Sequence, residues 1–204
     1  MLKRGMVLFL MTCMLCGAAL GEALPSGGLR PDQWGEPAAT AVPPFTFRGG
    51  VTWGMSREQV KGLEPVQLTE RSQGNWSILY PASPVEVSRY QADLVYMFYE
   101  DALKMITYDF GSGGGSADYA YLTGALDSVY GDHTEPDPGI VVGVMDQIYP
   151  GYYTTERLSS VRGWAAGEDT RVYLYYYGEN AYGILYVMSG SGFPAPGGYV
   201  TTGL

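Results

Sequence analysis

The segment 94–108 constrains the fold more than any other part of this sequence. Two runs rich in aromatic and β-branched residues, 94–99 and 102–108, flank the acidic pair Glu100 and Asp101. Runs of this kind on either side of a short turn predict a β-hairpin. Because both faces of each run carry apolar side chains, we expect the hairpin to form a central and well-covered part of a sheet.

Capping and periodicity predict one helix before the hairpin and another after it. Ser56 and Gln59 have the spacing of a capping box, and the short helix that follows ends near Gly62. Ser116 caps a second helix, which ends at Gly131. The residues expected to face the core are Met55, Val60 and Leu63 in the first helix and Tyr119, Leu122, Leu126, Val129 and Tyr130 in the second.

A third helix is expected over 140–149, where apolar residues recur at helical spacing. The neighbouring pair Val141 and Val142 also suits a strand. Two extended segments are expected at 76–80 and 85–90, and the prolines between them favour positions at the edge of a sheet.

The last part of the domain predicts an antiparallel meander of three strands, 158–166, 171–177 and 182–188, with polar and glycine-containing turns between them. The chain as a whole therefore predicts an α+β fold, an antiparallel sheet with two or three helices. Helix followed by strands occurs twice, in 56–110 and in 116–188, an order that two tandem helix-plus-strands units would produce.

The N-terminus has the features of a secretory signal peptide. Lys3 and Arg4 precede an apolar run over 6–15, and small residues follow, with cleavage expected after Gly21. The run is too short to span a bilayer, so we expect a secreted or extracytoplasmic bacterial protein with no integral membrane segment after cleavage. The expected organisation is a signal peptide at 1–21, a flexible linker at 22–44, the α+β domain at 45–188 and a flexible tail at 189–204.

Charge and composition exclude several classes of function. The formal charge of -9 becomes -11 once residues 1–21, which hold Lys3 and Arg4 but no acidic residue, are removed. An acidic chain with few basic residues is a poor match for nucleic acid. The two cysteines, Cys13 and Cys16, both lie in the signal peptide, so the mature chain has none. We therefore expect no disulfide, no cofactor and no nucleic-acid partner.

The motifs that could support catalysis or metal binding are weak. His133 is the only histidine, and we interpret it as a solvated loop residue. The neighbouring acids, Asp132, Glu135 and Asp137, do not have the spacing of a calcium loop. The glycine-rich loop 111–115 lacks the lysine and hydroxyl of a phosphate loop. No catalytic or metal residue is therefore expected, although the 21 acidic residues leave open a carboxylate pair for glycoside hydrolysis.

Tyrosine offers the most informative signal, with 18 in the chain and a cluster over 173–177. In a strand, Tyr173, Tyr175 and Tyr177 point to one side and the residues between them point to the other. Tyrosine is enriched at recognition surfaces, so these three residues are the predicted partner-binding site. Alternatively, the rings cover the sheet beneath a helix or stabilise it through cross-strand pairs.

The stretch from Gly54 through Met55 and Ser56 to Val60 resembles the opening of exported bacterial domains, including barrel-assembly lipoproteins of the SmpA/OmlA type. The doubled order of helix and strands is similar to that of β-lactamase-inhibitor-protein-like domains. Secreted proteins of Gram-positive bacteria also share a Tyr-Gly at a helix end and a tryptophan before two closing strands, here at 130–131 and Trp164. The chain lacks the lipoprotein cysteine motif. The resemblance implies binding to another protein through a sheet face, without catalysis.

Two functional hypotheses follow. The first is an exported, non-catalytic domain that binds a protein or cell-envelope partner through a flat tyrosine-bearing face, with no deep polar pocket. The second is a carboxylate-dependent hydrolase that acts on cell-wall glycans. It predicts a cleft with two acidic side chains roughly 5 to 10 Å apart, a finding that would overturn the first hypothesis.

Overall fold

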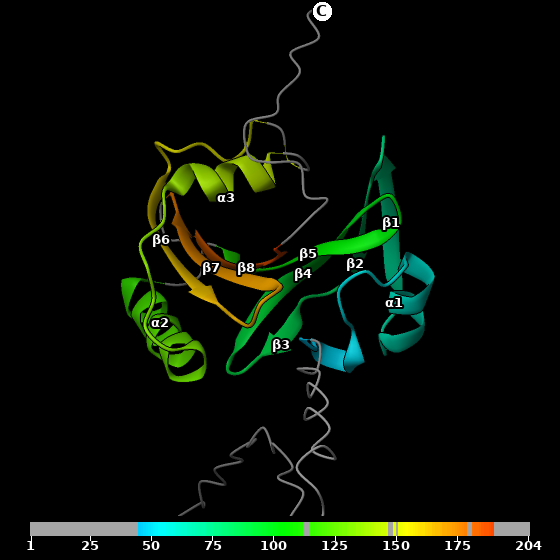
Figure 1. Ribbon diagram of the computed structural model, residues 1–204, viewed down its shortest axis with the longest axis horizontal. Helices are drawn as coiled ribbons and strands as arrows, with labels where there is room; N and C mark the ends of the chain where they lie inside the picture. The colour runs from blue at the N-terminus through cyan, green and yellow to red at the C-terminus, as the bar shows by residue number, and fades with distance from the viewer. Residues whose placement is uncertain (1–44, 112–114, 147–148, 150, 179–180, 190–204) are drawn as a thin grey trace, which may run out of the picture. The chain divides into compact units, whose positions relative to one another are not determined.

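The computed structural model describes residues 45–111, 115–146, 149, 151–178 and 181–189. The predicted signal peptide and linker, and all but the first residue of the predicted tail, lie outside this part of the chain. The described residues form an antiparallel sheet of eight strands with three α-helices, which confirms the predicted α+β fold (Figure 1). The helices are α1 (Arg57–Leu63), α2 (Ser116–Tyr130) and α3 (Pro138–Met145), and a 3-10 turn, η2 (Arg48–Gly50), precedes them.

The strands follow a simple order across the sheet, β1-β2-β4-β5-β8-β7-β6, with β3 paired only to β4. The chain from α1 to β5 and the chain from α2 to β8 each end on a strand in the middle of the sheet. These two strands, β5 and β8, pair with each other and so join the two halves. The strands are β1 (Leu68–Gln73), β2 (Trp76–Pro81), β3 (Val85–Val87), β4 (Tyr90–Tyr99), β5 (Ala102–Asp109), β6 (Leu158–Ala165), β7 (Thr170–Tyr177) and β8 (Ala181–Met188).

The predicted hairpin is β4 and β5, and it lies in the centre of the sheet as expected. Its two turn residues, Glu100 and Asp101, have φ angles of 50° and 63°, as a type I′ turn requires. Arg57 at the start of α1 donates a hydrogen bond from Nε to Asp101 Oδ1 at 2.6 Å. The turn of the hairpin is therefore tied to the first helix.

Helix boundaries follow the capping signals. The capping box of α1 is confirmed, since the Gln59 amide donates to Ser56 Oγ at 3.3 Å and the Ser56 amide donates to Gln59 Oε1 at 2.9 Å. In α2 the N-cap is Gly115 rather than Ser116. The third helix is shorter than expected, and Asp137 caps it by accepting a hydrogen bond from the Gly139 amide at 2.7 Å.

Two residues expected in the core, Leu63 and Val129, are exposed instead. Each lies in the last turn of its helix. The inward contact is made by the neighbouring residue instead: Glu64, which follows α1, is buried, and the Tyr130 ring centroid lies 6.3 Å from that of Phe45. Periodicity identified the buried side of each helix but not which residue makes its last inward contact.

The sheet has a helical cover on both faces. Helix α3 lies on one face, and α1 and α2 lie on the other (Figure 1). Strand β1 was not foreseen, and it pairs with β2, so the expectation that 76–80 forms an edge strand is wrong. None of the helices in the described part of the chain combines the length and the apolar character needed to cross a bilayer.

Candidate functional site

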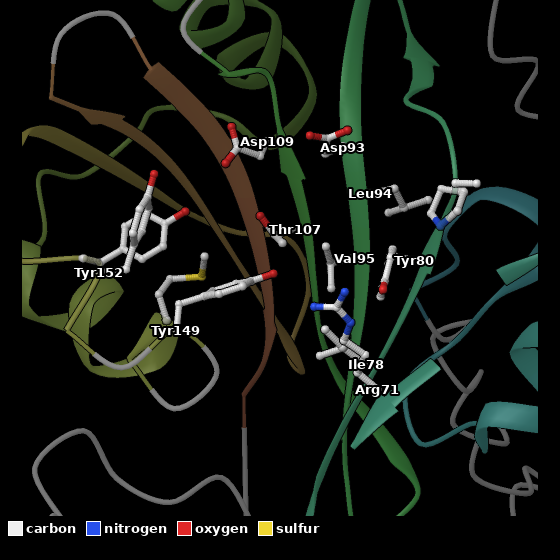
Figure 2. Close-up of a pocket in the computed structure, with 14 residues that line it drawn as sticks. Arg71, Ile78, Tyr80, Asp93, Leu94, Val95, Thr107, Asp109, Tyr149 and Tyr152 are labelled. Carbon is white, nitrogen blue, oxygen red and sulfur yellow. The ribbon is translucent and has the colours of Figure 1, made fainter. Parts of the chain in front are cut away.

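The α3 face of the sheet is only partly covered, and the open part holds a cavity of about 560 Å³. The cavity floor is formed by strands β1, β2, β4 and β5, which lie beside the half that α3 covers (Figures 1 and 2). Met145 at the end of α3 and three tyrosines after it form a wall. The residues around the cavity are Arg71, Ile78, Tyr80, Pro81, Ala82, Asp93, Leu94, Val95, Thr107, Asp109, Met145, Tyr149, Tyr152 and Tyr153.

Two aspartates lie side by side at one end of this cavity (Figure 2). Asp93 on β4 and Asp109 on β5 are direct partners in the antiparallel register. Directly opposed residues in such a pair have Cβ atoms about 5 Å apart and point to the same face of the sheet. The hairpin therefore positions two carboxyl groups on one wall, close enough to interact.

The environment raises the pKa of Asp109 above its ordinary value. Burial is the main cause, and the negative charge of Asp93 acts in the same direction. The Gly111 amide opposes the shift by donating a hydrogen bond to Asp109 Oδ1 at 2.7 Å. Among the described residues, neither aspartate forms an ion pair with a basic side chain. Within the described ranges, the pair therefore has no internal cation to offset its negative charge.

Two hydroxyl groups lie at or beneath the cavity floor. Thr107 is 2% exposed and lines the cavity, and Tyr175 is equally buried on the neighbouring part of the sheet. The two hydroxyls approach each other, but neither has a hydrogen bond of good geometry to any described residue. The Tyr175 phenol lies over Gly183, where any side chain would collide with it. Thr107 therefore lines the cavity, but its hydroxyl oxygen is itself buried and lies close to the Tyr175 hydroxyl.

Tyrosine rings form the wall opposite the strands of β1 and β2. The Tyr153 ring lies 4.9 Å from that of Tyr177 between centroids, and the Tyr152 ring lies 5.7 Å from Tyr177. The Tyr177 phenol also donates a hydrogen bond to the Tyr152 carbonyl. Tyr152 itself is 57% exposed and stands at the rim of the cavity (Figure 2). Packing on β7 therefore holds this wall in place.

Arg71 is the one basic side chain among the cavity-lining residues. It comes from β1, and its guanidinium carbon lies 5.5 Å from the centroid of the Tyr80 ring. Figure 2 shows Arg71 at the opposite end of the cavity from the two aspartates. The cavity is therefore negative at one end and positive at the other, with apolar and aromatic residues between.

The predicted binding row occupies a different environment from the one expected. Tyr175 and Tyr177 are buried, and Tyr173 is partly buried, on the sheet face that α3 covers. Val172 and Leu174 on the opposite face pack beneath α2. The expected exposure of the row is corrected, because both faces of β7 are covered and strand alternation alone does not tell which face is open. Partner binding by these three tyrosines stays a prediction, and it would require the α3 side to open.

The weaker sequence signals have structural explanations. His133 Nδ1 lies 2.8 Å from Asp127 Oδ1, which also accepts a hydrogen bond from Trp164 Nε1 at 3.0 Å. The histidine is thus held against α2 rather than simply solvated. In the described ranges, no three histidine, cysteine or acidic side chains gather closely enough to hold a metal ion. Residues 112–114 of the glycine-rich loop lie outside those ranges.

Four of the cavity-lining residues were not predicted as site residues from the sequence: Asp93, Asp109, Thr107 and Arg71. A signal for the aspartates was present, because one acid precedes the first run of the hairpin and the other follows the second run. Hairpin pairing brings such flanking positions together. No family model, curated protein or solved structure matches the chain. The resemblance to exported bacterial domains therefore stays a prediction, and the site must be interpreted from its own geometry.

Proposed function

We propose that this chain is an exported, non-catalytic domain that binds a cell-envelope partner by taking a group of that partner into the cavity on the α3 face. The observation that carries the proposal is the cavity itself, with its paired carboxylates and its tyrosine wall. The cavity and its aspartate pair overturn the flat, pocket-free binding face expected from the sequence. The binding proposed here therefore uses a different site from the one expected.

The lining supports binding in a way typical of ligand pockets. Such pockets are mainly apolar and aromatic, with a few polar groups that orient the ligand. Here Ile78, Val95 and Met145 supply apolar surface, while the polar groups are gathered at the two ends. Most of the lining comes from strands of the central sheet, which preorganises the site and reduces the ordering cost of binding.

A matched pair of tyrosine variants tests the location of the site. Tyr152 and Tyr121 are 57% and 45% exposed, and of these two only Tyr152 lines the cavity. We expect Tyr152→Ala to weaken sedimentation with isolated bacterial cell walls by about tenfold, whereas Tyr121→Ala retains it. Walls stripped of protein distinguish a glycan partner from a protein partner. Equal binding by both variants would overturn the cavity as the binding site.

The carboxylate pair also favours a second candidate, a glycan hydrolase. In that mechanism Asp109, whose pKa is raised, protonates the leaving oxygen and Asp93 acts as base or nucleophile. The placement of the pair argues for binding instead. Glycoside hydrolysis needs the two groups to flank the scissile bond, whereas both aspartates project from one sheet face at one end of the cavity.

Enzyme assays separate these two functions. A hydrolase releases reducing ends from cell-wall glycan, and Asp109→Asn would abolish that release because the variant has no proton to donate. We expect the wild type to release no more reducing ends than the Asp109→Asn variant does. Release by the wild type that the variant lacks would replace the binding proposal with the hydrolase.

A further inference from the structure

We infer that the cavity recognises a cationic group, an ammonium carried on an aliphatic stem, and that Asp93 and Asp109 bind its charged end. This inference rests on the proposed function, because it names the chemistry of the group that the cavity admits. It depends on the placement of the two carboxylates, on the character of the walls and on the position of the cavity's own cation.

The two aspartates are arranged for a donor with several N–H bonds. Asp93 and Asp109 face each other across the β4–β5 pair, and both line the cavity. An ammonium has three donors and no acceptor, so it can donate to both carboxylates at once.

A neutral ligand would not offset the repulsion between the two aspartates. Two carboxylates on adjacent strands repel each other, and each is without a basic partner in the described part of the chain. A cation bound between them removes this repulsion and forms charge-assisted hydrogen bonds with both. A sugar hydroxyl could form hydrogen bonds but would not neutralise the pair.

The walls suit the stem that carries the charge. Ile78, Val95 and Met145 offer apolar contacts to methylene groups, and the rings of Tyr149 and Tyr152 lie across the cavity from the strands (Figure 2). Aromatic faces also attract an ammonium within about 6 Å of their centroid. A compact inorganic cation would make no use of these walls, so the ligand is an organic amine.

Arg71 lies too far from the aspartates to act as their internal cation. It is level with Ile78, which pairs with Met97, and Met97 is four residues from Asp93 along β4. At the rise of a β-strand, four residues correspond to about 13 Å. Arg71 therefore leaves the negative end free, and it adds a site for an anionic group at the far end of the ligand.

Three six-carbon probes test the charge requirement in the full chain. We expect hexylamine to bind at least about tenfold more tightly than hexan-1-ol, and hexanoate to bind more weakly than either. Asp93→Asn and Asp109→Asn should each weaken hexylamine binding about tenfold. Asp132→Asn is the matched control, since it removes the same charge from an exposed position outside the cavity. Chemical-shift titration measures all of these affinities.

The outcomes separate this inference from the proposed function. If hexan-1-ol binds as well as hexylamine, or Asp132→Asn weakens binding as much as Asp93→Asn, the cation inference is wrong. If cell-wall binding still depends on Tyr152 in that case, the proposed function stands without it. If hexylamine binds through the aspartates while cell-wall binding ignores Tyr152, the cation site stands and the envelope-binding proposal falls.

Discussion

Strand β4 contributes to two carboxylate sites that lie on opposite faces of the sheet. The two sites differ in what compensates their negative charge. On the α1 face, Tyr96 of β4 donates a hydrogen bond to Glu64, whose carboxylate also lies 3.2 Å from Arg48 Nε. The Glu64 side chain is 0% exposed. On the α3 face, Asp93 of β4 opposes Asp109 and no cation joins them among the described residues.

The difference indicates which charge serves the fold and which is available to a ligand. A fully buried carboxylate must have internal partners, because its desolvation costs several kcal/mol. The aspartate pair lines a cavity, where solvent or a ligand can compensate the charge. Glu64 therefore connects η2, α1 and the sheet, whereas the free energy of the aspartate pair depends on what enters the cavity.

Breaking the Glu64 site should have the largest effect on stability. Arg48→Ala leaves the buried Glu64 carboxylate without its cation, so we expect the free energy of unfolding to fall by about 3 kcal/mol. Urea unfolding at pH 7 measures the change. In the double variant Arg48→Ala with Glu64→Gln, compared with each single variant, much of the loss should be recovered. An additive result in this cycle would show that the pair is not coupled.

The two buried tyrosines that belong to these sites provide a sharper contrast. Tyr96→Phe removes a hydrogen bond to a buried carboxylate and should destabilise the fold by about 2 kcal/mol. Tyr175→Phe removes a phenol whose hydroxyl has no well-formed partner in the described residues, so the change should be less than about 0.5 kcal/mol. Thermal or urea unfolding of both variants provides the comparison. Equal losses would mean that Tyr175 is better satisfied than its geometry indicates.

The aspartate site should also change how stability depends on pH. The pKa of Asp109 is raised above its ordinary 3.8, chiefly by burial, so the folded protein holds this proton more tightly than the unfolded chain. The stability that Asp109 contributes by holding this proton is fully present below its ordinary pKa. It is lost as the pH rises through the raised pKa of the folded protein. Relative to Asp109→Asn, the unfolding midpoint of the wild type should therefore fall as the pH rises across that window. The lowered pKa values of Glu70, Asp101, Asp118, Asp127 and Glu156 act in the opposite direction in both proteins, so the difference between the two profiles isolates Asp109.

Asp109→Asn should remove the Asp109 contribution from the pH profile, whereas Asp132→Asn should keep it. The asparagine can still accept the hydrogen bond from the Gly111 amide, so the backbone contact is kept. A profile with the same slope in both variants would assign the pH dependence to another group. The other titratable side chains that line the cavity are Arg71, Tyr80, Asp93, Tyr149, Tyr152 and Tyr153.

The smallest expected effect concerns the positive end of the cavity. Arg71→Gln removes a distant like charge, so hexylamine should bind slightly more tightly, by less than about threefold. Binding of 6-aminohexanoate should weaken instead, because Arg71 can pair with its carboxylate. Chemical-shift titration of both probes tests this opposite sign. A parallel change for the two probes would place the ligand away from Arg71.

Local patterns allowed several elements to be predicted without the structure. The hairpin, the capping box at Ser56 and the closing meander depend on neighbours within a few residues, and each is confirmed. The exposure of the Tyr173 row could not be predicted in the same way. Whether a strand face is open depends on which helix packs on it, and α3 covers this face from a different part of the chain.

The sequence by itself determined the α+β class and the antiparallel hairpin, because side-chain periodicity and turn residues act locally. It also placed one acidic residue just before the first apolar run of that hairpin and another just after the second run, and pairing of the two strands brings these residues together. Only the tertiary structure decided that these acids face a cavity and that the tyrosine row does not face solvent. Those outcomes depend on where α3 ends and on the strands β1 and β2 that extend the sheet beyond it, which are contacts between distant segments.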